Sequence, residues 1–315
     1  MESKIVLPTV RKRVGLGEII FSIPTLLILA IFFLILGLII YYGAPVISWN
    51  FLTGTPGFRM LYGEPLPFVP STFYNEPFNL QIMPYGGILP MIFGTLALVS
   101  GAIGIAVPLG VLSAVYLNEY LKEGLFKSFI NQVIGNLAGV PSIVFGIFAF
   151  TFFSKQLNFG VSLISGWLVL GFMALPIIIK STEEALKAIP RGFREASLAL
   201  GANKWETITS VVLPAATPGI STGVILGIGR IAGETAAILF AASIFYQSGL
   251  FPSNVFQPVM ALTYHLYYEA TSSPFAGINR PYEFGTALVL LGIVLLFSMI
   301  AIYIRNRGQK KRKGW

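Results

Sequence analysis

Residues 19–42 read IIFSIPTLLILAIFFLILGLIIYY and contain no charged side chain. A membrane-spanning helix needs about 20 mostly apolar residues to cross the hydrocarbon core of a bilayer. This segment has that length, whereas the apolar region of a cleaved signal peptide has only about 7–15 residues. No evident cleavage site of small residues follows it. We therefore interpret residues 19–42 as a retained first span.

Outward from this segment, the chain contains five further apolar windows. They cover residues 88–116, 129–153, 157–179, 207–240 and 284–303. The composition agrees, because 55% of the residues are hydrophobic and 11% are charged, against about 25% charged in soluble domains. We predict an all-α membrane protein with six transmembrane helices.

The few polar residue types in the chain limit its chemistry. All 13 acidic residues are Glu, there is no Cys, and there is one His. Disulfides and Cys-based metal sites are excluded, and His-based metal sites and Asp-centred catalytic sites lack their residues. We expect no catalytic residue, no metal and no cofactor on this chain.

The Lys and Arg residues predict the orientation in the membrane. Of the 21 such residues, only Arg59, Lys155 and Arg280 fall outside when the N-terminus is cytoplasmic, and Arg230 lies inside a window. Because cytoplasmic loops carry an excess of Lys and Arg, we expect both termini in the cytoplasm and the chain in the plasma or inner membrane. The net charge of +8 is then a topology signal and does not indicate a nucleic-acid partner.

Two long connections are predicted outside. The segment 43–87 is rich in Pro and aromatic residues, which favours a packed loop. The segment 245–283 has apolar residues at helical spacing, which predicts a short amphipathic helix on or dipping into the membrane; they are Val255, Val259, Leu262 and Leu266. His265 lies in that helix, and we interpret it as an interfacial polar residue rather than a metal ligand.

The predicted cytoplasmic connection 180–206 begins with a helix signal. Ser181, followed three residues later by Glu184, is typical of a helix N-cap with its capping box. The helix must end before Pro190, because proline does not fit a helix interior. Asn203 is a candidate N-cap for the next span.

Between these signals we predict a second short helix, over residues 192–200. Gly201 ends it, because glycine adopts the left-handed conformation of a helix C-terminus without strain. One face of this helix is small and partly apolar, formed by Phe193, Ala196, Ser197 and Leu200. Such an element either folds against its own chain or fits a groove on a partner, and the pattern favours docking.

Glu195-Ala196-Ser197, Gly201 and Leu213-Pro214 resemble the EAA loop of permeases from binding-protein-dependent ABC importers, with Ser in place of the second Ala. The resemblance implies the MetI-like permease fold and a coupling helix that sits in a cleft of the ATPase subunit. The residues implied in that coupling are Phe193, Glu195, Ala196, Ser197, Leu200 and Gly201.

Further stretches narrow the resemblance. Residues 86–95 (GGILPMIFGT), 137–146 (LAGVPSIVFG), 182–187 (TEEALK) and 229–235 (GRIAGET) are similar to phosphate-specific permeases of the PstA type, over about residues 85–300. On this basis we divide the chain into a tail (1–17), a first span with its external loop (18–84), a permease core (85–304) and a basic tail (305–315).

Arg230 and Glu234 are the charged residues inside the fifth window. An Arg at a bilayer centre costs about 2.5–3.5 kcal/mol on insertion scales, so it faces the bundle interior or water. Residues four apart are neighbours on one helical face. The pair is either a structural ion pair or a contact for a passing oxyanion, which matches the guanidinium fork. The resemblance implies the second role, with Thr235 beside them in the pathway.

The chain contains no Gly-x-x-x-x-Gly-Lys-[Ser/Thr] loop for nucleotide phosphates. ATP hydrolysis is therefore expected on another chain. The resemblance implies an ATPase dimer (PstB type) inside, a phosphate-binding protein (PstS type) outside, and a homologous permease subunit (PstC type) that shares the pore in the lipid bilayer.

Three alternatives remain open. A permease for another oxyanion, such as sulfate or molybdate, shares the EAA loop. A secondary transporter is disfavoured because the sequence shows neither an inverted repeat nor a second intramembrane carboxylate. An intramembrane enzyme is disfavoured because no nucleophile and base accompany the Arg–Glu pair.

Overall fold

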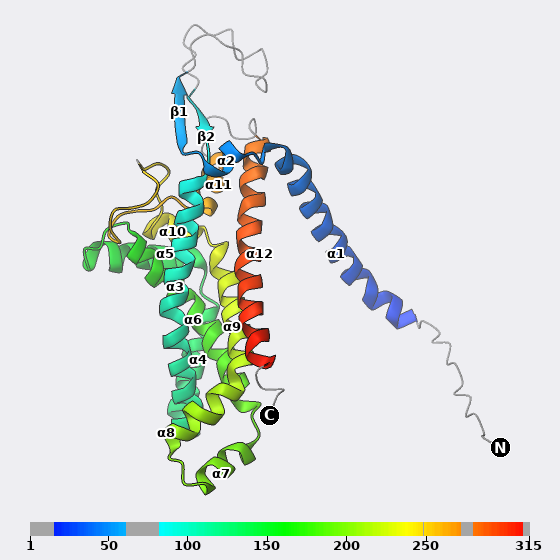
Figure 1. Ribbon diagram of the computed structural model, residues 1–315, viewed down its shortest axis with the longest axis vertical. Helices are drawn as coiled ribbons and strands as arrows, with labels where there is room; N and C mark the ends of the chain where they lie inside the picture. Colours follow the sequence, from blue (N-terminus) through cyan, green and yellow to red (C-terminus); the bar gives the residue numbers. More distant parts are fainter. Residues whose placement is uncertain (1–15, 61–81, 248, 272–279, 311–315) are drawn as a thin grey trace, which may run out of the picture.

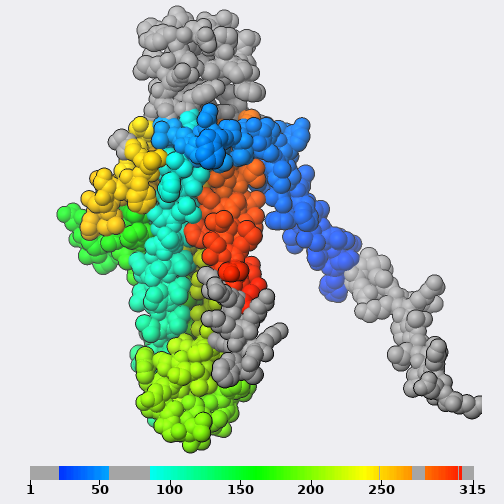
Figure 2. Space-filling view, in the orientation of Figure 1, coloured from blue at the N-terminus to red at the C-terminus, as the bar shows by residue number. Residues whose placement is uncertain are grey.

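The computed structural model describes residues 16–60, 82–247, 249–271 and 280–310. Four long helices form an elongated bundle (Figure 1): α3 (Leu89–Val115), α6 (Leu163–Lys187), α9 (Leu213–Ala232) and α12 (Arg280–Lys310). Within it, α6 packs against both α3 and α9, and α9 packs against α12. The first helix, α1 (Leu16–Gly43), leans away from the bundle and meets α12 near its own C-terminal end (Figures 1 and 2).

Five helices are long and apolar enough to cross a membrane within the described residues. They cover Phe21–Val46, Leu89–Tyr120, Leu163–Lys187, Lys204–Ala232 and Pro281–Tyr303. A sixth apolar segment, over the window predicted at 129–153, is a pair of helices bent at a break and not one continuous helix. α4 (Leu125–Ala138) and α5 (Ser142–Ala149), the latter continued by the π-helical η4 (Phe150–Gln156), meet at a bend of 98°.

The bend has a local cause. Pro141 precedes α5 and has an extended backbone, with φ −59° and ψ 140°. Proline has no N–H to donate into a continuing helix, and it disfavours helical geometry in the residue before it. The chain therefore changes direction between α4 and α5.

The predicted helix start at Ser181 is also wrong. α6 runs without interruption from Leu163 to Lys187, and the Ser181 hydroxyl donates to the carbonyl of Gly219 in α9. The glycines of α9 permit this close approach, as a Cβ at Gly219 would lie 2.4 Å from the Cβ of Ala185, and one at Gly223 would lie 2.6 Å from that of Ser181. Small residues at this spacing let two helices pack backbone to backbone.

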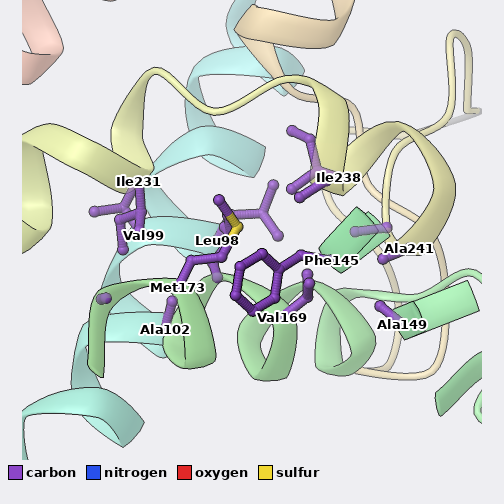
Figure 3. Close-up of a cluster of buried hydrophobic side chains, with 14 of the residues drawn as sticks. Leu98, Val99, Ala102, Phe145, Ala149, Val169, Met173, Ile231, Ile238 and Ala241 are labelled. Carbon is purple, nitrogen blue, oxygen red and sulfur yellow. The ribbon is translucent and has the colours of Figure 1, made fainter. Parts of the chain in front are cut away.

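The fifth window, predicted over residues 207–240, is a series of helices. It begins with α8 (Lys204–Thr207) and the π-helical η5 (Ile208–Val212), continues as α9, and resumes after a break as α10 (Ala236–Ala241). Figure 3 shows Ile231 of α9 and Ile238 of α10 on either side of this break, both facing a core of buried apolar side chains. Leu98, Phe145, Val169 and Met173 bring α3, α5 and α6 into the same core.

The two predicted outside connections contain regular structure of their own. The described part of the first holds η1 (Ala44–Val46), α2 (Trp49–Thr53) and an antiparallel pair, β1 (Pro56–Met60) with β2 (Ile82–Gly86). Residues 61–81 of that loop lie outside the described residues. This pair is a small addition to an otherwise helical fold.

The described part of the second connection contains α11 (Leu262–Thr271), which begins after Val255 and Val259 of the predicted helix. Val255 and Val259 precede it, and Val259 instead bridges Ser243. Residues 248 and 272–279 lie outside the described residues. The expectation of an interfacial His265 is wrong: its side chain is buried and stacks on Phe245, with Tyr282 of α12 at its edge.

Candidate translocation site and coupling helix

The break after α9 places the two charged residues of the fifth window. Arg230 lies in the last turn of α9, Gly233 follows the helix end, and Glu234 lies in the break before α10. The Arg230 Nη1 donates to the Glu234 Oε2 at 2.6 Å. The predicted contact is therefore present, but it crosses a helix break instead of one turn of a continuous helix.

The helix break makes this order of charges favourable. The C-terminal end of a helix carries partial negative charge, which favours a cation in the last turn, and Arg230 occupies that turn. Glu234 accepts a hydrogen bond through Oε1 from the backbone N of Ala237 at 3.4 Å. In one continuous helix, Arg before Glu would be the poorer arrangement.

The two side chains differ in exposure. The Arg230 side chain is 42% exposed and the Glu234 side chain is 5% exposed. Within the described part of the chain, Glu234 is the one hydrogen-bond partner of the Arg230 guanidinium. The Glu234 side chain is thus enclosed by protein, while the Arg230 side chain is partly exposed and its guanidinium has further N–H donors beyond the one that bonds Glu234.

Two threonines that were not predicted as site residues form hydrogen bonds in the neighbourhood of Glu234. The Thr263 hydroxyl of α11 donates to the backbone carbonyl of Glu234 at 2.9 Å. The Thr95 hydroxyl of α3 accepts from the backbone N of Leu262 at 2.9 Å, so α3 fixes the start of α11. A small pocket between these elements is lined by Thr95, Glu234 and Thr263 among apolar residues.

The predicted pathway residue Thr235 directly precedes α10. Its side chain is half-buried and forms no cap hydrogen bond, and its carbonyl accepts from the backbone N of Leu239. The structure therefore brings Arg230 and Glu234 together and places Thr235 beside them. Thr95 lay in the stretch 86–95 that carried the resemblance, whereas nothing in the sequence singled out Thr263.

The short helix of the loop 180–206 is α7 (Arg191–Ala199). It ends as predicted, with Gly201 in the left-handed conformation at φ 86°. Asn203 caps α8 as predicted, because its side chain accepts from the N of Glu206 and the Glu206 carboxylate accepts from the N of Asn203. Gly201 thus marks where α7 ends, and Asn203 marks where the following span begins.

The apolar residues of α7 point away from the bundle. Phe193 is 54% exposed and Leu200 is 90% exposed, and Glu195, Ala196 and Gly201 are also exposed. Ser197, predicted on the same docking face, instead faces the chain itself, with its hydroxyl 3.0 Å from that of Thr207. Five of the six predicted residues are therefore exposed.

An apolar helical bundle with a charged pair at a helix break and an exposed amphipathic loop helix is the architecture of a membrane transport subunit. Residues 106–309 match the family described as binding-protein-dependent transport system inner membrane component, and the chain belongs to this family.

Known relatives match this sequence over most of its length. The chain is 38% identical over 229 residues to the phosphate transport system permease protein PstA 1 of Mycobacterium tuberculosis, which covers 72% of each chain. It is 35% identical to the PstA of Xylella fastidiosa, covering 71% of this chain and 77% of the relative. It is 33% identical to the probable ABC transporter permease protein YqgI of Bacillus subtilis, covering 72% of this chain and 80% of the relative.

Solved structures share the fold at low sequence identity. A bacterial ABC transporter involved in the import of the acidic polysaccharide alginate matches with a TM-score of 0.57 at 13% identity, covering 91% of this chain and 94% of that chain. The MetNI methionine ABC transporter, in an inward-facing conformation, matches with a TM-score of 0.54 at 17% identity, covering 70% and 97%. The predicted MetI-like permease fold is confirmed.

Proposed function

We propose that this chain is the membrane-spanning permease subunit of an ATP-driven phosphate importer and forms half of its translocation pathway. The observation that carries the proposal is the partly exposed Arg230 side chain, paired with the buried Glu234 side chain at a break in the fifth span. The relatives that are named phosphate transport permeases support phosphate as the substrate.

The pair has the chemistry that a passing oxyanion needs. A guanidinium presents donors in a planar fork that matches two phosphate oxygens at once. The adjacent carboxylate limits how tightly an anion is held, because conduction requires binding strong enough to admit an ion and weak enough to release it. Glu234 is held at Oε1 and at its carbonyl, so Arg230 is the member of the pair with freedom to turn toward the substrate.

In the proposed complex, ATP hydrolysis on other chains supplies the energy for transport. In the proposed orientation, with both termini in the cytoplasm, α7 faces the cytoplasm and its exposed Phe193, Glu195, Ala196, Leu200 and Gly201 meet a separate ATPase dimer of the PstB type. A PstC-type permease subunit provides the other half of the pathway, and a PstS-type binding protein delivers phosphate from outside. ATP hydrolysis then belongs to the partner, and this chain performs no catalysis.

The alternatives are weighed by the same observations. An importer of sulfate or molybdate would use the same guanidinium, and the phosphate relatives disfavour it. A secondary transporter was disfavoured because the sequence showed no second intramembrane carboxylate. The structure does bury one, Glu183 of α6, which on its own would favour this alternative. It is paired with Lys180 at 3.1 Å, and membership of a binding-protein-dependent family favours ATP-driven import.

Reconstitution of the complete four-component system tests the proposal. Proteoliposomes containing both permease subunits and the ATPase, supplied with the binding protein, are assayed for ATP hydrolysis with phosphate, sulfate or molybdate outside. We expect stimulation and uptake with phosphate alone. Equal stimulation by sulfate or molybdate would replace the proposed substrate, and uptake without ATP would refute ATP-driven import.

A further inference from the structure

The inward face of α7 is polar. Of its nine residues, only Arg194 and Ser197 are half-buried, and the others are exposed. These two residues are three apart, so they lie on one face of the helix. The side-chain hydrogen bonds of α7 to the rest of the described chain come from these two residues. The short helix is therefore attached by directed polar contacts and leaves its apolar side chains uncovered.

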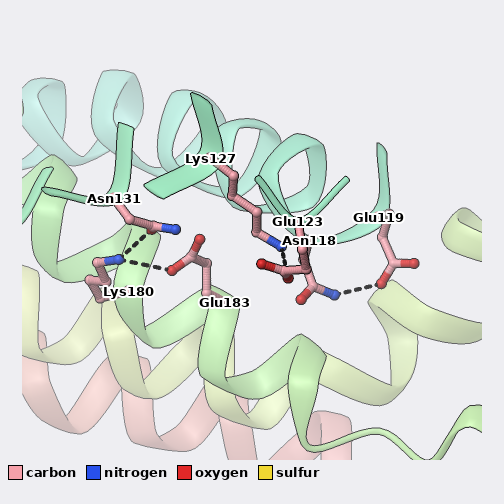
Figure 4. A network of polar contacts seen from close by, with 7 residues as sticks. All are labelled: Asn118, Glu119, Glu123, Lys127, Asn131, Lys180 and Glu183. Atoms are coloured by element: carbon pink, nitrogen blue, oxygen red, sulfur yellow. Dashed lines mark hydrogen bonds and ion pairs between the residues drawn. The ribbon is translucent and has the colours of Figure 1, made fainter. Parts of the chain in front are cut away.

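Arg194 joins three elements. Its Nη2 donates to Glu119 Oε1 at 2.7 Å and its Nε donates to Glu119 Oε2 at 3.3 Å, which is a two-pronged contact. The same guanidinium donates to the carbonyls of Leu186 and Ile189, both at 3.0 Å, at the C-terminal end of α6. Asn118 donates to the same Glu119 carboxylate at 2.8 Å (Figure 4). The Glu119 side chain is 9% exposed and that of Arg194 is 21% exposed.

Two of the side-chain contacts of α7 lie in or directly beside π-helical turns. Glu119 lies in η3 (Tyr116–Tyr120), which continues α3. Thr207, the partner of Ser197, is the residue directly before η5, from which α9 continues. π-Helical turns inside longer helices are rare and are found frequently at functional sites. Besides its bonds to the end of α6, α7 therefore contacts α3 and α9 where each departs from regular α-helical geometry, or directly beside that point.

We infer that Arg194 and Glu119 are positioning residues that transmit displacement of α7 to α3. The Ser197–Thr207 contact transmits the same displacement to α9. Arg230 lies in the last turn of α9, at the opposite end of that helix. A two-pronged ion pair fixes distance and angle together, so it transmits displacement in either direction, unlike apolar packing, which is non-directional. This inference rests on the proposed function. It assigns a role to the face of α7 opposite the one that meets the ATPase.

Substitution of each partner tests the link in the assembled transporter. Arg194→Gln and Glu119→Gln remove the ion pair without touching the outward face of α7. Arg191→Gln is the matched control, because Arg191 is an exposed Arg of the same helix. Three quantities are measured for each variant: ATPase subunit that copurifies, ATP hydrolysed, and phosphate imported. We expect normal copurification and continued hydrolysis, with phosphate imported per ATP reduced about fivefold or more, the scale of a typical coupling between sites.

A purely structural role gives a different result. If uptake falls only in proportion to the amount of assembled complex, or if phosphate imported per ATP is unchanged in both variants, the inference is overturned. Arg194→Lys provides a further check, because it keeps the charge but loses the fork. It should give a ratio of phosphate to ATP between those of the wild type and Arg194→Gln.

A spectroscopic readout separates this inference from the identity of the substrate. The chain contains no Cys, so Phe93→Cys and Leu226→Cys, at exposed positions of α3 and α9, accept spin labels specifically. ATP should change the distance between the labels in the wild-type background and not in Glu119→Gln. An equal change in both backgrounds, or none in the wild type, would overturn the link, whichever anion is transported.

Discussion

The Arg230 Nη1 and the Glu234 Oε2 lie 2.6 Å apart across the break between α9 and α10, and the Arg230 side chain is 42% exposed while the Glu234 side chain is 5% exposed. A partly exposed cation beside a buried counter-charge suits a site that binds a second anion transiently, because that anion can contact the guanidinium without displacing the carboxylate.

Replacement of Arg230 by Gln should abolish most phosphate uptake and leave the complex assembled. A charge-assisted hydrogen bond is worth about 1.5–3 kcal/mol, so its loss reduces uptake about tenfold or more. Uptake of radiolabelled phosphate, normalised to copurified ATPase, measures the effect. Loss of assembly with normal uptake by the surviving complexes would show that Arg230 acts in packing alone.

Replacement of Glu234 by Gln should have a different signature. The neutral amide leaves the positive charge of Arg230 uncompensated, so phosphate is held more tightly and released more slowly. We expect a lower maximal uptake rate together with greater retention of phosphate by the purified complex. A lower rate with weaker retention would contradict a tempering role for the carboxylate.

Thr263 should matter through the Glu234 backbone. Thr263→Val keeps the shape of the side chain and removes the hydrogen bond to the Glu234 carbonyl, at a cost of about 0.5–1.5 kcal/mol. We expect a lower thermal midpoint and reduced uptake per complex. Thr222→Val is the matched control, because that hydroxyl donates to the Pro218 carbonyl within its own helix. Equal effects of the two substitutions would show that Thr263 has no specific role at the site.

The sequence predicted those features that depend on local chemistry. The spans follow from apolar length, and the ends of α7 and α8 follow from Gly201 and Asn203, whose conformations depend on their own residue type. The helix start predicted at Ser181 was wrong because α6 continues through this residue, whose hydroxyl donates to the Gly219 carbonyl of α9 and does not cap a helix. A tertiary contact of this kind leaves no trace in the local pattern.

The helix break at Glu234 was missed for a related reason. An apolar window records length and composition, and both α9 and α10 satisfy it. The contact between Arg230 and Glu234 was predicted from a spacing of four, which survives the break. By contrast, Thr263 reaches Glu234 from α11 over 29 positions, and Arg194 reaches Glu119 over 75, so no spacing rule indicates either contact.

Gly201 should control the direction in which α7 ends. Its φ of 86° is unfavourable for a residue with a side chain, so Gly201→Val costs about 1–2 kcal/mol and redirects the chain after α7. We expect less ATPase to copurify and less uptake. Gly192→Ala is the control, because a Cβ there meets nothing within 4 Å and its φ is not positive. Full copurification and uptake in Gly201→Val would count against docking through this helix.

His265 should make the protein sensitive to mild acid. Burial lowers the pKa of His265 from 6.5 to about 4, so the unfolded chain binds a proton more readily than the folded chain between these values. Stability is therefore complete above pH 6.5 and falls as the pH drops, by about 2 kcal/mol at pH 5. His265→Phe keeps an aromatic ring against Phe245 and Tyr282 and has no proton to gain. The thermal midpoint of the wild type should drop more than that of the variant between pH 7 and pH 5, and parallel drops would show that other groups determine the acid sensitivity.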